Sequence, residues 1–158
     1  MQQLVPPVQL LVIGDGPDSG ALQRFSETLG WSAVQLENAA ELSGSYDEWT
    51  AAIVKTHNYG RDCAVLRALL PLGLRYIGLL GPRRRRDQLL GDVLDSGVEG
   101  AGNVFGPAGL DLGGDSPEAI ALSIVAEIQA VFAGGSHRPL RERRAPIHAV
   151  PQDVALAC

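Results

Sequence analysis

Short apolar runs alternate with amphipathic segments along most of this chain. Five apolar runs, each followed by or ending at a glycine or a polar residue, predict buried parallel strands: residues 9–13, 31–36, 51–55, 76–81 and 104–105. Between and after them, apolar side chains recur at helical spacing and predict four inward-facing stripes: Ala21, Leu22, Phe25 and Leu29; Val65, Leu66, Leu69 and Leu70; Leu89, Leu90, Val93 and Leu94; Ile120, Ile124, Ile128 and Val131. This order predicts an α/β fold, a Rossmann-like, doubly wound parallel sheet in three layers with right-handed crossovers.

Capping residues predict where these helices begin. Asp18 or Ser19 is expected to cap the first helix and Asp62 the second, because short polar side chains accept hydrogen bonds from free amides at a helix start. Ser116, followed by Pro117, is expected to cap the last helix.

The stretch 38–50 is polar and turn-rich, and it is too short to hold both a full helix and another regular strand. We therefore expect residues 51–55 to lie directly beside residues 9–13. The loops after the strands would then face one crevice at the carboxyl edge of the sheet. The candidate cofactor-binding residues in these loops are Gly14, Gly16, Glu37, Thr56, His57, Asn58, Gly81, Arg83, Arg84 and Asp111.

Residues 14–20 read Gly-Asp-Gly-Pro-Asp-Ser-Gly between a strand and a helix, the context of a dinucleotide fingerprint. Glu37 follows about 20 residues later, where an acid would bind ribose hydroxyls. The pattern is eroded, because its third glycine is one position late, Pro17 lacks an amide donor and two aspartates add negative charge. Both NAD(P) binding at Gly14 and Gly16 and a purely structural tight turn remain open.

Two basic features are expected at the same carboxyl edge of the sheet. His57 is expected at the point where strand order reverses, within reach of the glycine turn, or else as a turn histidine bonded to backbone. Residues 83–86 are four arginines at a helix start, and either they are solvated or Arg83 and Arg84 contact an anionic ligand. The two arginines that follow are expected to point outward or to pair with Asp87 and nearby acids.

Composition narrows the class of protein. The 158 residues predict one domain over residues 8–135 and a surface tail over 136–158. The chain has no apolar run of about 18 residues and no basic N-terminal segment, so we expect a cytoplasmic protein with no membrane contact. A net charge of −5 argues against nucleic-acid binding. Cys63 and Cys158 show no metal or disulfide spacing and are expected to be free thiols.

Several of these motifs, in order, resemble the XdhC/CoxI family of accessory proteins for xanthine dehydrogenase and related molybdenum hydroxylases. They are residues 53–58, residues 76–81 with the arginine run, 109–113, 116–118 and 120–128. The resemblance covers roughly residues 9–133. This chain differs from the family at Asn58, where Asp is frequent, and at Pro82, where Ser is usual.

The resemblance implies a Rossmann-type C-terminal domain of a maturation factor. Such proteins are associated with binding molybdenum cofactor, with installing its terminal sulfur ligand and with delivering it to the apo-enzyme. The implied partners are a molybdenum hydroxylase such as xanthine dehydrogenase, a cysteine desulfurase and a separate subunit carrying the family's cysteine-bearing N-terminal domain. Apart from the resemblance, a homodimer is considered because a second copy of this chain would supply the other wall of a substrate pocket that one domain is too small to complete.

Three functions follow from these patterns. The first is a carrier of a molybdopterin-type cofactor rather than a catalyst, because the candidate site is poor in paired acids, bases and activated nucleophiles. The second is an NAD(P)-dependent oxidoreductase with His57 as proton donor. The third is a non-catalytic interaction module with a degenerate nucleotide site.

Overall fold

A five-stranded parallel sheet forms the centre of the computed structural model, which describes residues 6–43, 45–100 and 103–147. Its strands lie in the order β2-β1-β3-β4-β5, with every neighbouring pair parallel. Their bounds are β1 (Gln9–Ile13), β2 (Ser32–Leu36), β3 (Thr50–Val54), β4 (Tyr76–Leu79) and β5 (Val104–Phe105). The predicted doubly wound fold is confirmed.

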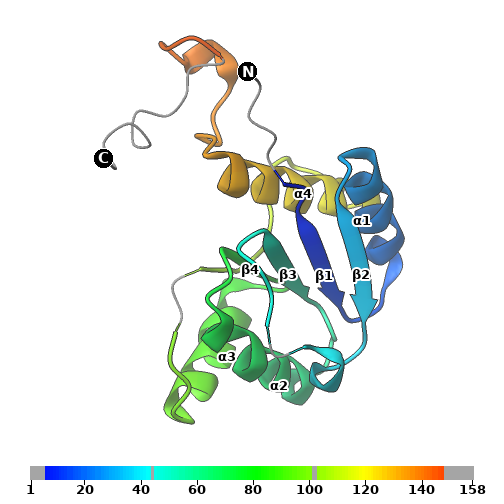
Figure 1. Cartoon of the computed structure of the whole chain (residues 1–158), viewed down its shortest axis with the longest axis vertical. Helices are drawn as coiled ribbons and strands as arrows, with labels where there is room; N and C mark the ends of the chain where they lie inside the picture. The colour runs from blue at the N-terminus through cyan, green and yellow to red at the C-terminus, as the bar shows by residue number, and fades with distance from the viewer. Residues whose placement is uncertain (1–5, 44, 101–102, 148–158) are drawn as a thin grey trace.

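Helices cover both faces of the sheet, which gives the three predicted layers (Figure 1). Helices α1 (Pro17–Thr28) and α4 (Pro117–Ala133) lie on one face, and α2 (Tyr59–Leu69) and α3 (Arg83–Asp95) lie on the other. Successive residues of β1 point to opposite faces, so Leu10 packs with α1 and α4 whereas Leu11 packs with α2. A central strand buried on both faces explains the continuous apolar run.

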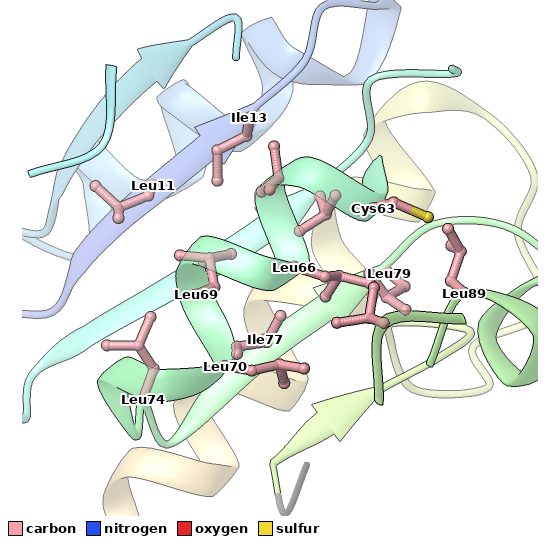
Figure 2. Close-up of a cluster of buried hydrophobic side chains, with 14 of the residues drawn as sticks. Leu11, Ile13, Cys63, Leu66, Leu69, Leu70, Leu74, Ile77, Leu79 and Leu89 are labelled. Atoms are coloured by element: carbon pink, nitrogen blue, oxygen red, sulfur yellow. The ribbon is translucent and has the colours of Figure 1, made fainter. Parts of the chain in front are cut away.

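The core under α2 is built from leucine and isoleucine side chains (Figure 2). Leu66 and Leu69 of α2 are fully buried against Ile77 of β4. Each such leucine contributes roughly 1.5–3 kcal/mol relative to an exposed one.

Helix α3 supplies fewer side chains to this core than the sequence predicted. Leu89 and Val93 are buried, but Leu94 is 40% exposed. The expectation for Leu94 was wrong because it lies about 100° around the helix from Val93, beyond the stripe that faces the sheet.

The connection between β2 and β3 contains a short 3-10 helix, η1 (Ala39–Glu41), and no strand among its described residues. As a result β3 pairs directly with β1, as expected, with Leu11 opposite Ala52. Strand order therefore reverses between β1 and β3, which is where open α/β sheets present a ligand crevice.

Two of the predicted helix caps were wrong. Helix α1 begins one position before Asp18, with Gly16 as its N-cap and Pro17 in the first turn, and Asp18 is buried. Helix α2 is capped by Asn58, whose Oδ1 accepts from Arg61 N at 3.0 Å. Asp62 lies inside α2, and its carboxylate binds Thr56 and Arg85 instead of capping the helix.

The predicted cap of α4 is confirmed. Ser116 Oγ accepts a hydrogen bond from Ala119 N at 3.1 Å, and Gly134 ends the helix in a left-handed conformation. After it, the described residues 136–147 are exposed and lead away from the sheet (Figure 1).

The domain boundary itself stays a prediction, and Cys158, with residues 148–157, lies outside the described residues. Cys63 is a buried free thiol. No described helix combines the length and the apolar character needed to cross a membrane.

Candidate functional site

A crevice lies at the carboxyl edge of the sheet and contains two hollows. The larger hollow has a volume of about 490 Å³ and is lined by Lys55, His57, Asp62, Leu80, Gly81, Arg85, Pro107, Ala108 and Ile120. The smaller hollow has a volume of about 230 Å³ and is lined by Gly14, Asp15, Glu37, Thr56, His57 and Arg61. His57 lines both hollows, which therefore lie next to each other at this edge of the sheet.

Lys55 connects β3 to the glycine turn at the base of the crevice. Its side chain is 0% exposed and its Nζ lies 2.8 Å from Asp18 Oδ1. The same ammonium donates to Ser19 Oγ at 2.7 Å and to Asp15 O at 2.9 Å. All three N–H donors of the ammonium are thereby used.

The glycine turn needs both of its first two glycines. Gly14 has φ +113°, and a Cβ there would lie 2.2 Å from Lys55 O. A Cβ on Gly16 would lie 3.0 Å from Lys55 Nζ and 3.5 Å from His57 Nε2. His57 therefore does lie within reach of the turn, as the sequence predicted.

Asp62 holds the loop after β3 against helix α3. Its Oδ1 accepts from Thr56 N at 3.1 Å and also from Thr56 Oγ1. Its Oδ2 pairs with Arg85 Nη2 at 2.8 Å. Because both carboxylate oxygens already accept, Asp62 is committed to positioning Thr56 and Arg85.

Arg85 is the arginine of the run that lines the larger hollow. It lies across Gly81, where a Cβ would come within 3.1 Å of Arg85 Cδ. Arg83 and Arg84 are exposed and line neither hollow, whereas Arg86 pairs with Asp87 at 2.7 Å, as expected. Binding of an anion by Arg83 and Arg84 stays a prediction.

Glu127 of α4 supports the loop that contributes Pro107 and Ala108 to the larger hollow. Its Oε1 accepts from Tyr76 Oη at 2.7 Å and from Gly109 N at 3.0 Å. Burial, followed by this hydrogen bond, raises the pKa of Tyr76 far above its ordinary value. Tyr76 also stacks on Phe105 with ring centroids 4.6 Å apart. The loop that carries Pro107 and Ala108 is thus fastened to the core.

The other predicted site residues are distributed unevenly. Around the smaller hollow lie Gly14, Glu37, Thr56 and His57, and Gly81 lines the larger one. Asn58 is used as the α2 cap, and Asp111 is exposed and lines neither hollow.

Sequence reasoning missed Lys55, Asp62 and Arg85 as crevice residues. The signal for Lys55 was present, since a charged residue directly after a fully apolar strand needs a buried partner. Within the described residues, no three His, Cys, Asp or Glu side chains lie close enough together to hold a metal ion.

Comparisons with known proteins place this architecture in context. A family model described as "XdhC Rossmann domain" matches residues 10–128. The chain is 31% identical over 150 residues to a probable xanthine dehydrogenase subunit of Bacillus subtilis (strain 168), covering 81% of this chain and 44% of that protein.

A crystal structure described as a xanthine dehydrogenase from Bacillus halodurans has the same fold, with a TM-score of 0.71 and 23% identity. The match covers 90% of this chain and 48% of that one. The chain therefore spans about half the length of these relatives.

Proposed function

Because the chain belongs to the XdhC Rossmann-domain family, we propose that it serves xanthine dehydrogenase-type molybdenum hydroxylases as an accessory protein. In this proposal its crevice binds molybdenum cofactor, or a related phosphate-bearing nucleotide, while the cofactor is sulfurated or inserted. Similarity to the Bacillus subtilis relative supports an association with xanthine dehydrogenase.

The composition of the larger hollow carries the proposal. Leu80, Pro107, Ala108 and Ile120 provide apolar surface for a planar ring. Arg85 and His57 provide hydrogen-bond donors for a phosphate. A pterin that bears a phosphate has both features. When bound, the cofactor supplies the molybdenum centre of the hydroxylase, and the residues of this chain hold its organic part.

The groups around the crevice favour a carrier over a catalyst. Both oxygens of Asp62 already accept hydrogen bonds, from Thr56 and Arg85, and all three donors of the Lys55 ammonium are used by the glycine turn. Cys63 lies in the core and lines neither hollow, and burial raises the pKa of its thiol, which favours the unreactive protonated form. His57 lines both hollows and stays the candidate proton donor of the oxidoreductase alternative.

Recovery of bound cofactor tests the proposal directly. The full chain is purified under reducing conditions from cells that make molybdenum cofactor, and released small molecules are identified by mass spectrometry and pterin fluorescence. We expect a molybdopterin species that co-elutes with the protein and activates an apo-hydroxylase. Protein that neither retains nor rebinds any pterin would contradict the proposal and favour the interaction module.

Nicotinamide binding is the second candidate. Glu37 lies beside Gly14 in the smaller hollow, the arrangement that holds an adenosine ribose in Rossmann domains. Calorimetric titration with NAD⁺, NADH, NADP⁺ and NADPH separates the two, since a carrier of pterin releases no heat with any of them.

A further inference from the structure

Strand β2 ends the sheet, and main-chain groups along its outer edge have no partner strand among the described residues. The strand order places β1 on one side of β2 and no described strand on the other (Figure 1). Ser32 N donates to a carbonyl just before β1 at 3.1 Å, and Leu36 O accepts from an amide just after β1 at 2.8 Å. Because the main-chain groups of successive strand residues point to alternate sides, Ala33 and Gln35 direct theirs away from β1.

The β2 edge has none of the features that usually protect a free strand edge. Such edges are guarded by lysines, prolines, bulges or very short strands. Strand β2 instead reads Ser-Ala-Val-Gln-Leu, without charge or proline, and keeps an unbroken register of five residues against β1. Strand β5, at the other end of the sheet, is only two residues long. Of the two sheet edges, β2 is therefore the one suited to pair with another strand.

Val34 lies at the middle of β2 and makes this edge complementary to itself. When two copies of β2 run antiparallel about a two-fold axis at Val34, each Val34 faces the same residue of the other copy. Ala33 then faces Gln35, and Ser32 faces Leu36. Since Ala33 and Gln35 carry the outward main-chain groups, each facing pair of these residues exchanges reciprocal hydrogen bonds. The two valines form the non-bonded pair, where side chains come closest, and no like charges face each other.

The side chains of β2 leave room for this pairing. Val34 is 37% exposed, although it lies in the middle of a strand. Gln35 Nε2 donates to Gly14 O at 2.7 Å, which turns this side chain toward the end of β1 and away from the free edge. A second copy would cover each Val34 with an equal apolar side chain.

We propose that β2 pairs antiparallel with β2 of a second copy of this chain, with the two-fold axis at Val34, and that this pairing joins the two sheets into one. In this register Glu37 lies opposite Trp31 of the second copy. Because Glu37 lines the smaller hollow, the segment before β2 of one copy lies beside the smaller hollow of the other. The dimer therefore adds to the wall of that hollow in each copy.

Cysteine cross-linking of the full chain tests the register. A non-bonded antiparallel pair has Cα atoms about 4.5 Å apart, within the range that a disulfide spans. In a Cys158→Ser background, Val34→Cys should link to its own copy on mild oxidation and migrate at twice the chain mass of 16.7 kDa in a non-reducing gel. Ser32→Cys is the matched control, because Ser32 is also exposed on β2 but faces Leu36, and this variant should stay unlinked.

Sedimentation equilibrium measures the same dimer without introduced cysteines. We expect the unmodified chain to dimerise, and Val34→Lys to weaken the dimer roughly tenfold or more, because it places two ammonium groups at the two-fold axis. Leu122→Lys, at an exposed position of helix α4, should leave the dimer unchanged.

Three results would overturn the proposal: an unmodified chain that is monomeric at every concentration, equal effects of the two lysine variants, or cross-linking at Ser32→Cys as strong as at Val34→Cys. Loss of binding to a hydroxylase, without loss of self-association, in Val34→Lys would assign the edge to another partner and also overturn it. Where Val34→Lys fails to fold, the unmodified chain and the two cysteine variants still decide the question. None of these measurements depends on the ligand of the crevice.

Discussion

Removing Asp18 tests whether Lys55 depends on it. Lys55 is 0% exposed in its side chain, and the 2.8 Å contact to Asp18 is the one charged acceptor among its three hydrogen bonds. Asp18→Ala leaves a full positive charge with two neutral acceptors. Breaking one side of a buried ion pair costs about 3–5 kcal/mol, a large part of the 5–15 kcal/mol that stabilises a typical domain.

The double variant Asp18→Ala/Lys55→Met separates the charge effect from the loss of packing. Methionine keeps most of the lysine's length without its charge, so the double variant should lie within about 2 kcal/mol of the unmodified chain. Urea unfolding followed by the fluorescence of Trp31 and Trp49 measures four proteins: the unmodified chain, Asp18→Ala, Lys55→Met and the double variant. A loss below about 1 kcal/mol for Asp18→Ala, or additive losses in the double variant, would refute this account of Lys55.

Three further predictions concern the frame around the crevice. Tyr76→Phe leaves Glu127 without one donor and should cost roughly 1–3 kcal/mol in urea unfolding. Because the folded pKa of Tyr76 is raised, the tyrosine stabilises the fold fully below pH about 10, and this stabilisation falls at higher pH. Between pH about 10 and higher pH, Tyr76→Phe should therefore lose less unfolding free energy than the unmodified chain. Equal losses in the two proteins would contradict this. Ser116→Ala should lower the unfolding free energy by about 1 kcal/mol, with Ser116→Asp as a control that keeps the cap. Gly14→Ala should prevent folding or lower the melting temperature sharply, since its Cβ would overlap Lys55 O; an unchanged melting temperature would contradict the turn geometry.

The fold was predictable because it depends on local periodicity. Alternating buried strands and amphipathic helices fixed the layers, and the short stretch after Glu37 correctly placed β3 beside β1. Predicting these features requires only the residue types and their spacing.

The site was less predictable because it depends on the directions in which individual side chains point. Arg84 and Arg85 are neighbours in sequence, yet one helical step of about 100° sends only Arg85 into the larger hollow. In the same way, Asp18 and Asp62 were assigned as caps by composition, whereas each is turned toward a cation brought by another element. Such pairings are set by tertiary packing and leave no periodic signal.

Glu127 connects helix α4 to the apolar wall of the larger hollow. One carboxylate oxygen fastens both a core tyrosine and the loop behind Ala108, although Glu127 itself lines neither hollow. The shape of the larger hollow could therefore be altered from helix α4, by changing the length or charge of a single side chain outside the crevice.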